Sequence, residues 1–318
     1  MPESHLLVSV SVITYNHEKF IEKALDSILS QKTSFDFEIV IGDDGSTDKT
    51  YQICAEHQKS SEIPIRLFNR DRSNYDKSYI HSARQNFLDT LKSCQGKYIA
   101  LLDGDDYWTD ELKLQKQVDF LESSSSYSAC VHRTFVLNSD GTLEPHRTKY
   151  KDSYTLNDLM AKYSLFHTSS FFFRKRFLHI PSWMKTISSG DLPLFAIMAN
   201  QGPIRFLSEV KPSIYRMHSG GITKSSFHNG IQFHLNRINM LDVFESNFYS
   251  ISHKRLSLVR SRHLVDIMNN KEAYSSPKNP IILKQIGKHL AFLPVFKVMQ
   301  FILISIKCRL FTVTSKKN

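Results

Sequence analysis

The chain has 318 residues, 41% hydrophobic and 23% charged, a composition typical of a folded globular protein and unlike a disordered or fibrous one. Its 41 Lys and Arg residues outnumber its 31 Asp and Glu residues, and the net charge of +10 favours an anionic partner: a nucleotide, a nucleic acid or an acidic membrane surface. The four cysteines are widely spaced without a CxxC pair, which argues against a zinc ribbon or disulfide framework and favours a reducing compartment.

The N-terminal third alternates between strand and helix patterns. β-branched and apolar runs predict strands at residues 6–14, 37–41, 63–68 and 98–102. Helical spacing and capping residues predict helices at about 17–31, from about 48 onward, and at 82–91. This alternation predicts an α/β fold, with a mostly parallel sheet covered by helices.

The rest of the chain carries a mixed pattern of shorter elements. The expected helices are at about 110–122 and 192–200, with partly helical character at 150–163, and the expected strands are at 128–137, 167–174 and 202–210. Two helical stretches follow at about 229–268 and 281–311, separated by a linker at 269–279. We therefore expect a domain at 1–225, with a first part at 1–110 and a second at 111–225, and a helical extension at 226–318.

Three carboxylates follow the strand at 98–102. Asp103, Asp105 and Asp106 are clustered around Gly104, at a strand end of the kind where open α/β sheets bind ligands. Clustered carboxylates repel one another unless a cation neutralises them, and hard oxygen ligands suit Mg²⁺ or Mn²⁺. The alternative is a turn that caps the next helix, which one Asp would satisfy but three fit poorly. We favour a metal site.

Three segments together resemble a known family. Residues 10–16 (VSVITYN), 39–48 (IVIGDDGSTD) and 101–106 (LLDGDD) occur in an order and spacing similar to family 2 glycosyltransferases of the GT-A fold, which transfer sugar from a nucleotide-sugar with inversion. The resemblance covers roughly residues 6–225, and it implies that 1–110 form the nucleotide-binding part and 111–225 the acceptor-binding part. It implies a divalent cofactor, Mn²⁺ or Mg²⁺, and a nucleotide-sugar donor, most simply a UDP-sugar.

The resemblance also implies roles for the matching positions. The donor-binding residues would be Thr14, Tyr15, Asn16, Asp43, Asp44, Asp103, Gly104, Asp105, Arg216 and His218. Within this set Asp44 would accept the base N–H, with Asp43 as a support or an alternative. A turn plus helix cap fits Asp43 as well as a binding role does, and fits Asp44 less well. Asp103 would bind ribose and metal, and Asp105 the metal on the diphosphate. Asp106 is expected to support them or to begin a helix.

Further positions downstream complete the expected site. Asp191 matches the family's general base, which removes a proton from the acceptor hydroxyl, although Asp before Leu-Pro is also a good helix cap. In the loop at 215–221 Arg216 would bind the leaving phosphate and His218 the metal. His167, Thr168 and Ser169 would lie near the acceptor, or on a solvated sheet face. Arg72 and Arg84 both lie near where relatives carry a base-contacting Arg.

The C-terminal stretch at 281–311 interleaves Lys and Arg with apolar residues and is broken by Pro294. Its uncharged run at 298–306 is too short to span a membrane. One hypothesis is that it lies on the inner face of the cell membrane, where a lipid-linked acceptor would be found. The alternatives are packing on the protein's own core or on a second copy of the chain, giving a homo-oligomer.

These expectations combine into one function. We predict a cytoplasmic enzyme that moves a sugar to a saccharide or lipid-linked saccharide in surface polysaccharide biosynthesis, with no nucleic-acid partner and with the membrane surface as the alternative location. The rival interpretations are a non-catalytic nucleotide- or saccharide-binding module with the same fold, and a sugar nucleotidyltransferase. The second rival should show a basic Gly-rich loop near the N-terminus, which the sequence lacks.

Overall fold

The computed structural model describes residues 6–75, 82–161, 164–187, 190–218, 220, 230–270, 287 and 298. The chain divides into two compact units. One consists of Met1–Leu159 and Ser164–His218, and the other of Met160–Tyr163 and Ser219–Asn318. The first unit contains the sheet and every described residue of the expected site.

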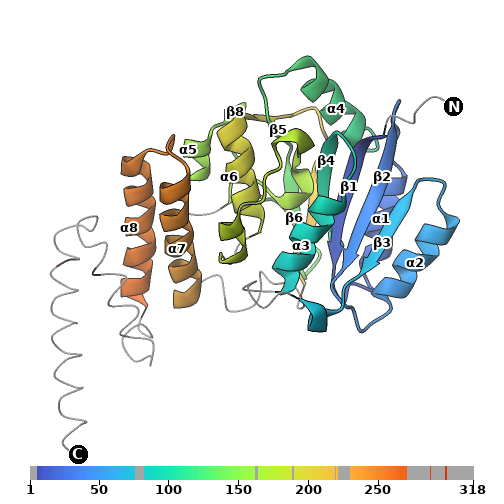
Figure 1. Ribbon diagram of the computed structural model, residues 1–318, viewed down its shortest axis with the longest axis horizontal. Helices are drawn as coiled ribbons and strands as arrows, with labels where there is room; N and C mark the ends of the chain where they lie inside the picture. The colour runs from blue at the N-terminus through green and yellow to red at the C-terminus, as the bar shows by residue number, and fades with distance from the viewer. Residues whose placement is uncertain are drawn as a thin grey trace, which may run out of the picture. The chain divides into compact units, whose positions relative to one another are not determined.

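An eight-stranded, mostly parallel sheet forms the centre of the first unit (Figure 1). In spatial order its strands are β3 (Ile65–Asn69), β2 (Asp36–Asp43), β1 (Leu6–Thr14), β4 (Tyr98–Asp103), β9 (Phe172–Arg174), β5 (Ala129–Val131), β10 (Ile204–Phe206) and β8 (Ser153–Tyr154). The first four are mutually parallel, whereas β9 runs antiparallel to both of its neighbours. The predicted α/β class is confirmed.

The core forms where apolar strand residues meet the apolar stripes of the helices. Val8, Val10 and Val12 on β1 are fully buried and belong to one hydrophobic cluster with Ile21 and Leu25. The latter two lie on α1 (Ile21–Leu29), whose spacing of apolar residues places them on one face. The other helices of the N-terminal half are α2 (Thr50–Ser60), α3 (Ser82–Ser93) and α4 (Lys113–Ser123). The strand and helix alternation of this half matches the sequence pattern.

The predicted strand at 128–137 is wrong as a single element. The chain leaves the large sheet after β5, and His132 and Arg133 separate it from β6 (Thr134–Leu137). β6 belongs to a second sheet, in which it lies between β11 (Ser213–Arg216) and β7 (Leu143–Pro145). Both halves have strand-like composition and no turn residue lies between them, so the sequence carries no signal for the break.

Two further segments differ from the expected elements. Residues 150–163 supply β8 and a short α5 (Leu156–Leu159), and the predicted strand at 167–174 begins instead with a 3₁₀ turn, Thr168–Ser170. That turn forms because the His167 ring nitrogen accepts a hydrogen bond from the Ser169 backbone N–H. Other 3₁₀ turns are at Arg72–Asn74, Lys175–Phe177 and Ser182–Lys185, and α6 spans Asp191–Gln201.

The described part of the second unit is a helical hairpin. The expected stretch at 229–268 consists of two helices, α7 (Ile231–Asn247) and α8 (His253–Asn269), which lie side by side (Figure 1). The Ser252 side chain caps the start of α8. Val298 packs against an apolar cluster of this hairpin, but the predicted linker at 269–279 and the helix at 281–311 otherwise lie outside the described residues. Among the described helices, none has the length and hydrophobicity required to span a membrane.

Candidate functional site

The carboxyl ends of β1, β2 and β4 bring the expected site residues to one edge of the sheet. In the strand register Thr14 pairs with Asp43 across β1 and β2, and Ile13 pairs with Asp103 across β1 and β4. The pairing continues past the strands, because the Asp44 N–H donates to the Thr14 carbonyl (2.9 Å) and the Gly104 N–H to the Ile13 carbonyl (2.8 Å). The two acidic loops are therefore fixed on either side of β1.

Gly104 allows a close approach between the second acidic loop and β1. A Cβ atom at this position would lie 2.7 Å from the Thr14 hydroxyl oxygen and 2.8 Å from its Cβ, closer than atoms in folded proteins pack. A larger residue would push Asp103 and Asp105 away from β1. The small residue between the two acids is thus a packing requirement of the site.

One carboxylate and two histidines form the centre of the site. The Asp105 Oδ2 atom lies 3.0 Å from Nε2 of His218 and 3.6 Å from Nε2 of His17. One ligand atom from each of these three residues lies within 4.8 Å of the other two. His17 comes from the loop after β1, Asp105 from the loop after β4, and His218 from just beyond β11, so three distant segments supply one cluster. A carboxylate with two imidazoles can hold a divalent cation.

The electrostatics of the three acids differ sharply. Burial opposes ionisation of Asp105, but its hydrogen bond to His218 and the nearby His17 outweigh burial and lower its pKa. Burial, with Asp105 and Asp191 as neighbouring charges, raises the pKa of Asp103 to about 8. Burial, with Asp105 and Asp103 as neighbouring charges, also raises the pKa of Asp106 well above its usual value. A cation beside Asp105 would favour the ionised forms of Asp103 and Asp106.

Arg216 lies beside this cluster and is held by the backbone. Its N–H donates to the Asp106 carboxylate (3.0 Å), and its guanidinium donates to the carbonyls of Asp105 (3.2 Å) and Phe20 (3.4 Å). The Tyr107 ring lies 4.6 Å from the guanidinium carbon. These contacts fix a positive charge next to the acids, although burial lowers the pKa of Arg216.

On the other side of β1, Asp44 is enclosed by donors. The Arg72 guanidinium donates to the Asp44 carboxylate (2.7 Å) and carbonyl (2.8 Å), and the Tyr75 hydroxyl donates to the second carboxylate oxygen. The guanidinium carbon also lies 3.7 Å from the centre of the Tyr15 ring. Of the two arginines that the sequence left open, Arg72 therefore belongs to this side of the site.

Asp43 and Asn16 hold the loop between β2 and α2. Both Asp43 carboxylate oxygens accept hydrogen bonds from Ser46, one from its backbone N–H and one from its hydroxyl. The Asn16 side-chain oxygen accepts a hydrogen bond from the Thr47 N–H (2.8 Å). The backbone N–H of Asn16 donates to the Ser46 hydroxyl (2.9 Å). These contacts are of the turn type that the sequence offered as the alternative for Asp43.

Asp191 begins α6 as its first residue, and Gly190 occupies the cap position. Its Oδ1 accepts from the Leu192 backbone N–H (2.8 Å), which orients the carboxylate at the helix start. It lies near Asp103, whose pKa it helps to raise, and near the buried Arg84. Burial lowers the pKa of Arg84 to about 10, against the opposing effect of Asp191. The second open arginine therefore belongs with the expected base.

The expected acceptor residues divide into one near the site and two inside the fold. The His167 ring nitrogen Nδ1 lies 3.5 Å from the Asp106 carboxylate, and burial lowers its pKa to about 4, with His146 adding to the effect. Thr168 and Ser169 are buried. The Ser169 hydroxyl bonds to that of Ser213 (2.8 Å), a contact between the 3₁₀ turn and the second sheet. The alternative prediction, that these residues lie on a solvated sheet face, is wrong.

His17 was not predicted as a ligand, although it directly follows the first motif, residues 10–16. The available signal was its position directly after the Tyr-Asn pair at the end of β1. Its backbone N–H donates to the Thr50 hydroxyl (2.7 Å), and its Nδ1 lies 3.2 Å from the Thr14 hydroxyl, so its Nε2 points to Asp105. Nothing in the spacing of the motif reveals that orientation.

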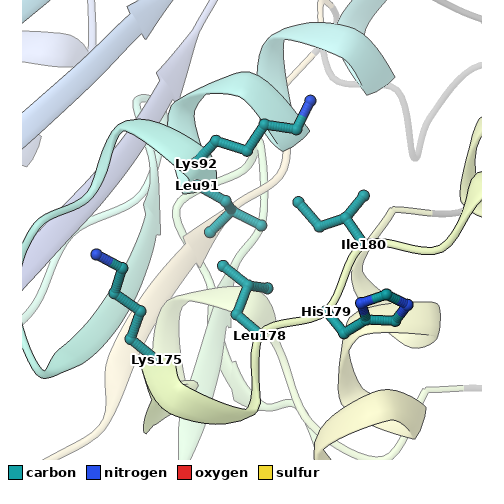
Figure 2. A pocket seen from close by; sticks show the side chains of 6 residues that line it. All are labelled: Leu91, Lys92, Lys175, Leu178, His179 and Ile180. Atoms are coloured by element: carbon teal, nitrogen blue, oxygen red, sulfur yellow. The ribbon is translucent and has the colours of Figure 1, made fainter.

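A shallow pocket lies away from these residues (Figure 2). It is lined by Leu91, Lys92, Lys175, Leu178, His179 and Ile180. The Lys175 N–H donates to the Lys97 carbonyl, just before β4 begins, whereas the site described above lies where β4 ends. The pocket is therefore at the opposite edge of the sheet.

Comparison with known proteins identifies the family. Residues 9–179, more than half of the chain, match the model for glycosyl transferase family 2. The chain belongs to this family. The match contains both acidic loops and His17, and the predicted family is confirmed.

The similarity to individual relatives extends beyond this segment. An uncharacterized Mycobacterium tuberculosis protein is 33% identical over 69% of this chain and 61% of its own length. The Escherichia coli UDP-Glc:alpha-D-GlcNAc-diphosphoundecaprenol beta-1,3-glucosyltransferase WfaP is 29% identical over 70% of this chain and 81% of its own. The structure of S. aureus TarS 1-349 in complex with UDP-GlcNAc has the same fold, with a TM-score of 0.63, 18% identity, and coverage of 91% of this chain and 82% of that chain.

Proposed function

We propose that this glycosyltransferase moves a sugar from a UDP-sugar to a saccharide or lipid-linked saccharide, with inversion, in surface polysaccharide biosynthesis. The observation that carries the proposal is the convergence of His17, Asp105 and His218. This cluster lies beside Asp103, whose pKa is raised, and near the carboxylate of Asp191. The name of WfaP, which specifies UDP-glucose and a diphosphoundecaprenol acceptor, supports the proposed donor and acceptor classes.

Mn²⁺ or Mg²⁺ fits the central cluster. Asp105, His218 and His17 would hold the ion, and Asp103 would contribute its charge to the same site. When bound, the ion neutralises the diphosphate of the donor as a Lewis acid. The mannosyltransferase PcManGT, a structural neighbour with a TM-score of 0.53 and 15% identity, has been solved in complex with GDP-Man and Mn²⁺.

The chain's own residues would orient the donor on both sides of β1. The Tyr15 ring, backed by the Arg72 guanidinium, offers a flat surface on which a base stacks, and Asp44 lies beside it as an acceptor. At the other end Arg216 provides a fixed positive charge next to Asp105, where the diphosphate would bind.

Asp191 would act as the general base. The acceptor hydroxyl oxygen forms a bond to the anomeric carbon while the bond from that carbon to the diphosphate oxygen breaks, and the hydroxyl proton passes to the Asp191 carboxylate. The Leu192 N–H fixes that carboxylate, and the neighbouring Arg84 favours its ionised form before the reaction. UDP then leaves with both bonding electrons.

A donor panel tests the proposal. The protein is incubated with Mn²⁺ and a series of UDP-, GDP- and dTDP-sugars, and binding is measured by thermal shift, followed by nucleotide release in the presence of lipid-diphosphate saccharides. We expect a UDP-sugar to give the largest shift and UDP release to require an acceptor. Binding without turnover on any acceptor would favour a non-catalytic module, and binding of sugar phosphates with nucleoside triphosphates would favour a nucleotidyltransferase.

Membrane association through residues 281–311 remains part of the proposal for a lipid-linked acceptor. The basic and apolar composition of this stretch supports it. Liposome flotation with anionic vesicles, comparing the full chain with one ending at residue 279, tests it. Equal flotation of the two would show that the stretch is not needed for membrane binding.

A further inference from the structure

A second cluster of ligating side chains lies in the α7–α8 hairpin, in the unit that lacks the proposed active site. His234 on α7 lies next to His263 and Asp266 on α8, and one ligand atom from each lies within 4.8 Å of the others. His263 and Asp266 are three residues apart on one helix and therefore share a face. We propose that these three residues form a binding site for a divalent transition-metal ion of the zinc class, independent of the proposed catalytic ion.

The distances suit such an ion. Nδ1 of His234 lies 2.9 Å from Nδ1 of His263 and 3.8 Å from Oδ2 of Asp266. Zinc bonds to nitrogen and carboxylate oxygen of about 2.0–2.2 Å, at tetrahedral angles, separate two ligand atoms by about 3.3 Å. The observed separations lie on either side of this value. Movements of about half an ångström would bring each of these two pairs to that separation, and the third pair, His263 and Asp266, has its ligand atoms within 4.8 Å of each other.

The chemistry of the cluster also favours a metal. Two imidazole nitrogens that face each other at 2.9 Å would bring their lone pairs together unless a proton or a cation lies between them. A shared proton satisfies the two histidines, whereas a cation also uses the negative charge of Asp266. His234 and His263 are 6% and 1% exposed and the Asp266 side chain is 30% exposed, so water screens its charge only in part. Two imidazoles and one carboxylate leave a fourth position for water, as in open zinc sites.

The additional acids around one cluster separate this site from the proposed catalytic one. Both clusters have two imidazoles and one carboxylate, but the catalytic cluster has the additional carboxylates Asp103 and Asp106 beside it, which suit hard ions such as Mn²⁺ and Mg²⁺. The hairpin cluster is defined by its two imidazoles and one carboxylate alone, which suit zinc, cobalt and nickel. The two sites should therefore be distinguishable by the ion that each prefers.

Such an ion would stabilise the hairpin. The neighbouring apolar cluster is small, with Ile238, Leu264, Ile267 and Met268 as its buried members. His263 and Asp266 directly precede two of these residues, and His234 lies one helical turn before Ile238. A metal bonded to both helices would add a link between α7 and α8 at the edge of this core, and its binding free energy would add to the stability of the folded hairpin.

The test uses the full chain carrying Asp105→Asn and His218→Ala, which removes the proposed catalytic ligands. Zinc content after equilibrium dialysis, the zinc-dependent change in Tm and the visible absorption spectrum with Co²⁺ are measured. We expect one zinc ion per chain, a rise in Tm and a Co²⁺ spectrum with nitrogen ligands. Less than a quarter of an ion per chain would overturn the proposal and leave a hydrogen-bonded histidine pair.

Substitutions within the hairpin locate the ion. His263→Ala and Asp266→Asn, each in the same background, should weaken zinc binding by at least about tenfold and abolish the Tm rise. His253→Ala removes an exposed histidine of the same helix and should leave both unchanged. Asp266→Asn keeps the side-chain shape, so it decides the matter if His263→Ala does not fold. Zinc retained by Asp266→Asn and by a folded His263→Ala would overturn the proposal, and failure of the donor panel would not affect it.

Discussion

Two neighbouring loops carry similar acidic sequences, but their carboxylates lie in different electrostatic environments. Gly42-Asp43-Asp44 follows β2 and Asp103-Gly104-Asp105-Asp106 follows β4, on either side of β1. In the first loop, Ser46 and Arg72 donate to the carboxylates. In the second loop the acids lie against one another.

That difference shows which acids need an external cation. Burial and like charge raise the pKa of Asp103 and Asp106, while the two histidines lower that of Asp105. A loop whose acids are already satisfied by protein donors gains little from a metal, whereas a loop with excess buried charge gains a great deal. The first loop is suited to shaping a binding surface and the second to holding an ion.

The largest effect is expected for Asp105→Ala, which removes the carboxylate shared by both histidines. Sugar transfer should fall by at least about a thousandfold, because the diphosphate leaving group loses the ion that stabilises it. Metal-dependent binding of UDP, measured by isothermal titration calorimetry with and without Mn²⁺, should disappear. Asp119→Ala, which removes an exposed acid on α4, is the control and should leave both unchanged. If Asp105→Ala still binds UDP more tightly with Mn²⁺, the second loop does not hold the ion.

Asp191→Asn tests whether Asp191, an acid near the β4 loop, acts as the general base. The amide keeps the helix start but cannot accept a proton, so kcat should fall by about 10²–10⁴ while donor binding is retained. Asp158→Asn, at another first helical turn, is the matched control and should keep its activity. A near-normal kcat for Asp191→Asn would limit this residue to a role at the helix start.

The sequence predicted the arrangement of the acids better than their environment. Strand patterns and the spacing of the motifs were enough to bring Asp44, Asp103 and Asp105 to one edge of the sheet, because parallel strands end together. They did not show that Arg72 binds Asp44, since the contact joins two loops through side-chain conformations. His17 was missed for the same reason, as its ring direction depends on the contact between its Nδ1 and the Thr14 hydroxyl.

The second half of the first unit was harder to predict. Its strands are three or four residues long, and β5 and β6 belong to different sheets although two residues separate them. Hydrophobic periodicity needs longer windows than these to distinguish one strand from two. The short turn after His167 depends on a local side-chain contact, which competes with strand formation and is not visible in composition.

Asp44→Asn should have a smaller effect than the changes at the second loop. It removes a charged acceptor beside Tyr15, so the Kd for UDP should rise about tenfold, within the 1–3 kcal/mol typical of one charged hydrogen bond, while kcat changes little. Arg72→Ala should give a similar result by freeing the Tyr15 ring. Arg66→Ala, which breaks another arginine–carboxylate pair between β2 and β3, is the control. A large loss of kcat in Asp44→Asn would mean that the first loop also serves the chemistry.

The smallest expected effect is a dependence of stability on pH that belongs to the second loop. The pKa of Asp103 is about 8 in the folded chain and near 3.8 when unfolded, so between these values the folded state binds more protons and stability falls as pH rises. In EDTA the Tm should therefore decrease by on the order of a few degrees between pH 6 and 8. Asp103→Asn should reduce this slope without removing it, because the pKa of Asp106 is raised as well. Mn²⁺ should also flatten the slope, since it stabilises the ionised acids. Asp119→Asn, at an exposed position, should keep the full slope, and an unchanged slope in Asp103→Asn would show that the excess charge of the second loop does not limit stability.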